Sequence, residues 1–151
     1  MIYLLDTDTF IFMVRGLKAT AREKARRSRA LSLVHGCQQA MREGHSVGLS
    51  AVSVSELEFG ARKSERYELE IEAVRKVLLP FDTYDYDSLN CPYHYGRIRQ
   101  ELEVKGRTIG SMDLLIAAHA LGLDATLVTN NEAHFARVNG LRIANWSRAD
   151  A

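Results

Sequence analysis

Acidic side chains at widely separated positions of this 151-residue chain are the residues best suited to do chemistry. Asp6 and Asp8 stand two apart in the opening stretch YLLDTDTF, Glu56 lies in SVSELEFG, and Asp113 lies in IGSMDLL. Carboxylates that crowd together repel one another unless a cation lies between them, and divalent ions such as Mg²⁺ and Mn²⁺ prefer oxygen ligands. If the fold brings these side chains together, the sequence predicts a metal site.

Short apolar runs mark the strands that must position these carboxylates. Such runs cover residues 2–5, 47–49 and 125–128, and residues 141–144 could add an edge strand. The intervening segments have helix-like apolar spacing or helix start and stop residues. We predict helices at residues 18–43, 53–62, 67–78, 82–105 and 111–121. The first could contain one break, and Pro92 would lie in an early turn of the fourth.

Strands that alternate with helices of this length require crossover connections, which predicts an α/β fold with a mostly parallel sheet covered on both faces. Ligands of open parallel sheets collect beyond the carboxyl ends of the strands. Asp6 directly follows the first strand, Glu56 comes shortly after the second, and Asn131 follows the strand at 125–128. A glycine-containing loop leads to the helix turn with Asp113. We therefore expect all four side chains at one edge of the sheet.

Each of these residues also has a purely structural interpretation. Asp6 or Asp8 could cap the helix that follows them, because Asp is a preferred N-cap residue. Glu56 could form a capping box with the serine three residues before it. Asp113 could interact with a helix dipole and Asn131 could be a turn residue. The functional interpretation depends on the four residues meeting at one place.

Composition limits the class of protein. The length and the 46% hydrophobic content fit one globular domain over residues 1–151. A formal net charge of +1 excludes a uniformly basic nucleic-acid coat and an acidic mimic. We find no apolar run long enough to span a membrane and no leader, and Cys37 and Cys91 suggest no disulfide framework, so we expect a cytoplasmic protein.

Other catalytic signatures are missing from the sequence. It contains no GxSxG, GxxxxGK[ST] or GxGxxG motif, and its five histidines lack metal-ligand spacing. We expect His119 to be a hydrogen-bonded helix histidine and Cys37 to belong to the core.

Four stretches, LLDTDTF, SVSELEFGARKS, IGSMDLLIAAHAL and LVTNNEAHFARVNGLRIANW, resemble the PIN-domain ribonucleases, specifically the VapC-type toxins of bacterial toxin–antitoxin pairs. They appear in the family's order and nearly span the chain. The resemblance implies a PIN-like three-layer sandwich, metal-dependent cleavage of RNA, homodimerisation and neutralisation by a small VapB-type antitoxin. Structured RNA such as transfer RNA is a common substrate in the family.

The resemblance also implies roles for individual residues. Asp6, Glu56 and Asp113 would form the acidic site, with Asp6 and Asp113 as ligands of Mg²⁺ or Mn²⁺. Glu56 would be a further ligand or would orient the nucleophile. Asn131 stands where many relatives have a fourth acidic residue, and Thr129 stands beside it; both would hold metal-bound water.

Basic side chains that could contact RNA form two groups. The segment KATAREKARRSR, at residues 18–29, contains Arg22 and Arg26, and Arg107 lies shortly before the predicted acidic helix. We predict that these three arginines bind RNA. The alternative for the first group is an ordinary solvated helix face.

Two rival functions remain open on the sequence. DTDTF also satisfies the DxDxT motif of haloacid-dehalogenase-type phosphatases, which predicts an acidic pair after a late strand, where this chain has TNNEAHF. The uncharged Asn131 also allows a degenerate, noncatalytic PIN fold that binds RNA or a partner protein.

Overall fold

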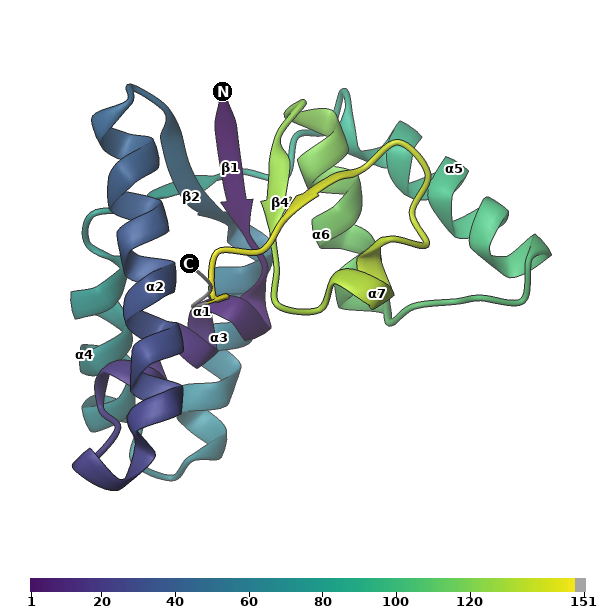
Figure 1. Cartoon of the computed structure of the whole chain (residues 1–151). Helices are drawn as coiled ribbons and strands as arrows, with labels where there is room; N and C mark the ends of the chain where they lie inside the picture. The colour runs from purple at the N-terminus through teal and green to yellow at the C-terminus, as the bar shows by residue number, and fades with distance from the viewer. Residues whose placement is uncertain (149–151) are drawn as a thin grey trace.

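Five parallel strands form the centre of the molecule, and helices cover both of their faces (Figure 1). The computed structural model describes residues 1–148. In chain order the elements are β1 (Ile2–Leu5), α1 (Thr7–Leu17), the 3₁₀ turn η1 (Ala21–Glu23), α2 (Lys24–Arg42), β2 (Ser46–Ser50), α3 (Ala51–Lys63), α4 (Tyr67–Leu78), β3 (Asp82–Tyr84), α5 (Cys91–Val104), α6 (Ser111–Gly122), β4 (Thr126–Val128), α7 (Glu132–Phe135) and β5 (Arg142–Ala144).

The strand order is β3-β2-β1-β4-β5, so the first strand of the chain lies in the middle of the sheet. Leu5 at the end of β1 is paired with Leu49 of β2 on one side and with Val128 of β4 on the other. Every ladder within residues 1–148 is parallel, so the predicted parallel sheet is confirmed. The chain builds the sheet outward from β1 first in one direction and then in the other, which makes the carboxyl end of β1 the switch point where ligands of such sheets bind.

Consecutive residues of β1 fill the two core layers, because side chains alternate between the faces of a strand. Leu5 packs with Phe10 of α1 in a cluster that also includes residues of α2. Leu4 packs with Ile98 of α5 and Ile116 of α6 on the opposite face. All five side chains are fully buried. The predicted three-layer sandwich is confirmed, with α1 and α2 on one side and α5 and α6 on the other (Figure 1).

Two of the predicted helices need correction. The predicted helix at 82–105 is wrong over its first part, because Asp82–Tyr84 is the edge strand β3 and a loop follows before α5 begins at Cys91. Pro92 lies in the first turn of α5, as predicted. The predicted helix at 18–43 begins only at Lys24, because α1 ends at Leu17 and η1 lies between them. The short helix α7 was not predicted at all.

No helix within residues 1–148 is both long and apolar enough to cross a membrane. The predicted single domain extends to residue 151, three residues beyond the part that the structure describes.

Candidate active site

Asp6 lies at the carboxyl end of the central strand and begins α1. Its Oδ1 accepts a hydrogen bond of 2.7 Å from the backbone N–H of Thr9, so it is the N-cap of that helix. Its own N–H donates to the Val128 carbonyl of the neighbouring strand at 3.1 Å. The structural interpretation of Asp6 is therefore confirmed, but it does not exclude a functional one. The side chain is only 3% exposed, which leaves a nearly buried carboxylate at the switch point of the sheet.

The surroundings of Asp6 oppose its ionisation. Burial raises the pKa of Asp6, hydrogen bonds from Thr129 and Thr9 lower it in part, and the charge of Asp8 raises it further. The net effect is a raised pKa. Thr129, which is fully buried at the end of β4, therefore lies next to Asp6.

Glu56 lies in α3, and its side chain is held by a contact with α1. The predicted capping box with Ser53 is wrong, because α3 begins at Ala51 and its N-cap is Ser50. The hydroxyl of Thr7 instead donates to Glu56 Oε1 at 2.6 Å and lies 2.8 Å from the Ser53 hydroxyl. Thr7 was not among the predicted site residues, although its position between the two N-terminal aspartates could have indicated that it belongs to the site.

The charges around Glu56 show that the carboxylates converge. Partial burial raises the pKa of Glu56, the hydrogen bond from Thr7 lowers it, and the charges of Asp113, Asp8 and Asp6 raise it further. The net pKa is raised. Asp6 and Asp113, predicted to share one edge of the sheet with Glu56, are therefore close enough for their charges to act on it, as is Asp8 in the first turn of α1.

Asp113 lies in the first turn of α6, where the N-terminal end of the helix favours a negative charge. Its Oδ2 is 3.0 Å from Nε2 of His134. His134 lies in α7, which follows β4 in the chain, whereas α6 precedes it. The ring of His134 meets that of Phe135, a fully buried residue, edge to face. His134 was missed because α7 was not predicted. The signal in the sequence was its position in TNNEAHF, directly after a strand that ends at the same edge.

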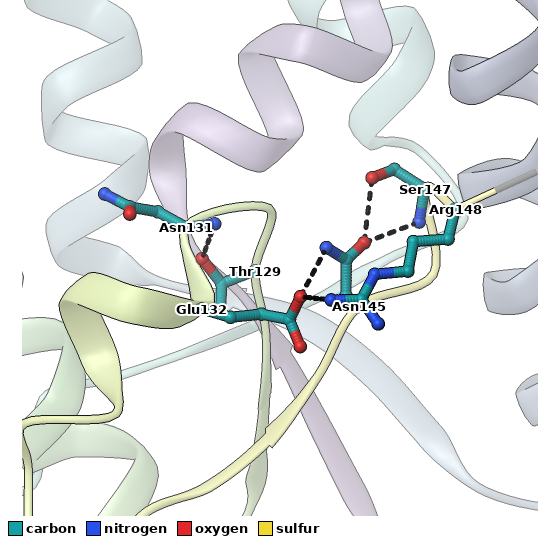
Figure 2. Close-up of polar contacts among 6 residues, drawn as sticks. All are labelled: Thr129, Asn131, Glu132, Asn145, Ser147 and Arg148. Atoms are coloured by element: carbon teal, nitrogen blue, oxygen red, sulfur yellow. Dashed lines mark hydrogen bonds and ion pairs between the residues drawn. The ribbon is translucent and has the colours of Figure 1, made fainter.

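Thr129 and Asn131 differ in their relation to the site. The Asn131 backbone N–H donates to Thr129 Oγ1 at 2.9 Å, which leaves the Thr129 hydroxyl hydrogen for Asp6. The Asn131 side chain is exposed and extends away from that of Glu132 (Figure 2). Within residues 1–148 we find a hydrogen bond for the backbone of Asn131 but none for its amide group. Its predicted role in holding water stays a prediction.

Glu132 is turned toward the C-terminal segment and away from Asn131 (Figure 2). Its Oε2 accepts a hydrogen bond of 3.1 Å from Asn145 Nδ2 and pairs with the Arg148 guanidinium. Asn145 also accepts from the N–H and hydroxyl of Ser147. These contacts attach α7, and with it His134, to the chain after β5.

The predicted RNA-binding arginines lie at different distances from the carboxylates. Arg22 is in η1 and Arg26 is in α2, beyond the far end of α1, an 11-residue helix that extends about 16 Å from Asp6. Arg26 also pairs with Glu23 at 3.1 Å. Arg107 is exposed in the loop that leads to α6. Of the three, Arg107 is nearest to Asp113 along the chain.

The donor atoms of the site fit a divalent ion that keeps much of its water. Within the described residues, no group of three or more His, Cys, Asp or Glu side chains is arranged to hold a metal ion by itself. Mg²⁺ is usually bound through one or two carboxylates and retains several waters, so a closed cage is not required. The nearly buried carboxylate of Asp6 and the partly buried one of Glu56 repel each other, both have raised pKa values, and they are the groups that such a cation would stabilise.

Two other reactive side chains lie outside the site, as predicted. His119 is fully buried, and its Nδ1 is 2.8 Å from the Ser50 hydroxyl. Cys37 lies in the core, where burial raises the pKa of its thiol to about 12. A thiol that stays protonated at neutral pH is a poor nucleophile.

Sequence comparison places this geometry among known proteins. Residues 3–141 match the model of the PIN domain family. The chain is 34% identical to the tRNA(fMet)-specific endonuclease VapC of Shigella flexneri, over 96% of this chain and 98% of the relative. It is 31% identical to Ribonuclease VapC2 of Rickettsia felis, over 98% of this chain and all of the relative.

Solved structures of related proteins also match this chain. The chain superposes with a TM-score of 0.79 and 30% identity on a chain of VapBC2 from Rickettsia felis bound to a DNA fragment from its promoter, covering 97% of this chain and 99% of that chain. A chain of DNA-bound VapBC from Salmonella typhimurium gives a TM-score of 0.78 at 29% identity, over 97% and 98% of the two chains. With its five-stranded parallel sheet and the carboxylates at the end of β1, this chain belongs to the PIN-domain family, among the VapC ribonucleases.

Proposed function

We propose that this chain is a metal-dependent endoribonuclease toxin that hydrolyses phosphodiester bonds of transfer RNA and is neutralised by a VapB-type antitoxin. One observation supports the chemistry above all others. The carboxylates of Asp6, Asp8, Glu56 and Asp113, which come from three different helices or their caps, lie close enough for the charges of the others to raise the pKa of Glu56. Folding places these repelling charges together although this opposes stability, which is expected where function requires a cation.

Asp6 and Asp113 are the residues that would hold Mg²⁺ or Mn²⁺. When bound, such an ion lowers the pKa of a coordinated water and offsets the negative charge of the phosphate. Thr129 lies beside Asp6 and lowers its pKa, which favours the charged carboxylate. His134 holds the carboxylate of Asp113 through the 3.0 Å contact between its Nε2 and Oδ2.

Glu56 is the residue that we assign to the nucleophile. The Thr7 hydroxyl occupies its Oε1, which leaves Oε2 to accept a hydrogen bond from the attacking water. A raised pKa makes this carboxylate a better proton acceptor than an ordinary glutamate. Asn131, whose amide has no hydrogen bond within residues 1–148, is free to bind water or substrate, as predicted from the sequence.

Phosphates of the RNA would contact arginines at two different distances from the carboxylates. Arg107 would bind close to the cleaved bond, and Arg22 and Arg26 would bind nucleotides farther away, beyond the end of α1. Each such contact adds to affinity without reading the base sequence. Transfer RNA as the substrate class is supported by the Shigella relative, which is named a tRNA(fMet)-specific endonuclease.

The antitoxin is supported by the solved VapBC structures. Homodimerisation and a cytoplasmic location remain predictions that rest on the family resemblance and on the sequence. Sedimentation of the purified chain would test the first.

The test is cleavage of transfer RNA by the purified chain in Mg²⁺ or Mn²⁺, with Asp6→Asn as the inactive control. We expect cleavage that stops on chelation and returns when the metal is restored. Cleavage that continues in chelator would contradict metal dependence. RNA binding without cleavage under any metal would indicate the noncatalytic alternative, and hydrolysis of a small aryl phosphate with intact RNA would indicate the phosphatase.

A further inference from the structure

A groove begins at Glu56 and extends away from the carboxylates between α1, α3 and α4. It offers about 150 Å³ of free space. Each helix contributes residues spaced three or four apart, which lie on one face. An apolar cavity of about this volume can hold one benzene ring, so the groove has room for a group of about the size of one six-membered ring. Its apolar lining consists of Ile11, Val14, Leu57, Ala61 and Val74.

The charged residues of the groove are unevenly paired. Lys18 and Glu70 lie 3.9 Å apart and offset each other. Arg15, which also lines the groove, is exposed and has no carboxylate within 4 Å among residues 1–148. An unpaired guanidinium therefore lines the same groove as Glu56 and the apolar side chains. A phosphate is the group that such a cation binds best, because the planar fork of arginine matches its oxygens.

Gly60 leaves the groove open. It lies one turn after Glu56 in the interior of α3, and a Cβ added there would meet no atom within 4 Å. Neither close packing nor an unusual backbone angle requires glycine at this position, although glycine in a helix interior is less favourable than alanine. An open glycine is not a site by itself, since Gly96 in α5 is equally free. At Gly60, however, the free space is the groove.

We propose that this groove binds one nucleotide of the RNA next to the cleaved bond, with its base on the apolar floor and its phosphate on Arg15. The inference rests on the proposed function, because it takes RNA as the substrate and Glu56 as part of the reaction centre. Glu56 is shared by the groove and the carboxylate cluster, so whatever fills the groove lies directly beside the bond that is attacked. An RNA strand satisfies both the ring-sized apolar space and the unpaired cation.

The test compares Gly60→Leu and Arg15→Ala with Gly96→Leu, the matched control on α5. We expect the first two to raise KM for transfer RNA about tenfold with kcat within about twofold of wild type, because each removes contacts of the groove to one nucleotide without touching the carboxylates. Gly96→Leu should change neither constant. Unchanged KM in both groove variants would overturn the proposal. If Gly60→Leu leaves KM unchanged but weakens antitoxin binding, the groove is a protein-binding surface and the proposal is equally wrong.

A second measurement separates this inference from the proposed function. RNA binding is followed in chelator by fluorescence anisotropy, with RNAs that lack one base on the 5′ or the 3′ side of the cleavage site, or at each loop position in turn if no cleavage is found. Wild type should bind one of the two abasic RNAs about tenfold more weakly than intact RNA, and Gly60→Leu should not distinguish them. Absence of cleavage by wild type would contradict the proposed function but not the groove as a nucleotide-binding site. If wild type and Gly60→Leu discriminate equally between the two abasic RNAs, the proposal for the groove is wrong and the proposed function is not affected.

Discussion

Nε2 of His134 lies 3.0 Å from Oδ2 of Asp113, so a residue of the short helix α7 fixes one carboxylate of the candidate site. Loss of this contact should leave Asp113 free to rotate. We expect His134→Ala to reduce kcat by about 10- to 100-fold, the effect typical of residues that orient a metal ligand. His134→Gln, whose amide nitrogen can reach the position of Nε2, should recover much of the loss. Cleavage assays at several Mg²⁺ concentrations measure both variants, and equal rates for Ala and Gln would contradict the assignment.

The Thr7 hydroxyl provides the next test, because it donates to Glu56 at 2.6 Å. Thr7→Val keeps the shape of the side chain but removes the donor, so Glu56 loses the hydrogen bond that holds its Oε1 in place. We expect a loss of about tenfold or more in kcat at neutral pH, since hydrogen bonds to charged groups contribute about 1.5–3 kcal/mol. Thr7→Ser retains the donor and should stay close to wild type. A fully active Thr7→Val would show that this hydrogen bond does not support the reaction.

Asp6 is the N-cap of α1 and the proposed metal ligand, and these two roles can be separated. Asp6→Asn keeps a good N-cap and removes the charge, whereas Asp6→Ala removes both. We expect both variants to be inactive toward RNA. Thermal unfolding should place Asp6→Ala about 1 kcal/mol below Asp6→Asn, the usual contribution of a cap. Equal stability of the two would mean that the cap contributes nothing here.

The metal-free protein should depend on pH in a specific way. The pKa values of Asp6 and Glu56 are raised by folding, so their protonated forms favour the folded state. The associated stability is fully present below the ordinary pKa of about 4 and is lost as pH rises through the raised values. In chelator, the double variant Asp6→Asn/Glu56→Gln should therefore be more stable than wild type at pH 7, and its advantage should shrink as the pH falls toward 4. An advantage that is constant with pH would contradict the raised pKa values.

Added metal should act on the same charges. At pH 7, Mg²⁺ or Mn²⁺ should raise the melting temperature of wild type, because an ion that binds only the folded protein stabilises it by mass action. The increase should be much smaller in Asp6→Asn, which lacks one proposed ligand. Calorimetry or thermal fluorescence in matched buffers measures the difference. Equal shifts in both proteins would place the bound ion elsewhere.

The sequence was most informative where strong patterns repeated. The apolar runs before Asp6 and after Ala125 became β1 and β4, and alternation of strands with helices led to the parallel sheet. Since parallel strands end at the same edge, the meeting of Asp6, Glu56 and Asp113 could be predicted without any contact being known. This part of the site follows from connectivity alone.

The short elements could not be predicted in the same way. β3 has three residues, two of them exposed, and its place in the sheet depends on pairing with β2 and not on its own pattern. α7 has four residues and is held by the contacts of Glu132 with Asn145 and Arg148, which are distant in sequence. Thr7 and His134 act through partners 49 and 21 residues away, so the sequence around each of them could not identify its partner.

The position of β1 at the centre of the sheet affects how the protein is made. Asp6, at the end of β1, is synthesised before β2 and long before β4, the two strands that flank β1 in the sheet. A growing polypeptide therefore has no assembled reaction centre until β4 has been made. A cell that makes such an RNA-cutting chain beside its own translating ribosomes is not exposed to its activity before that point.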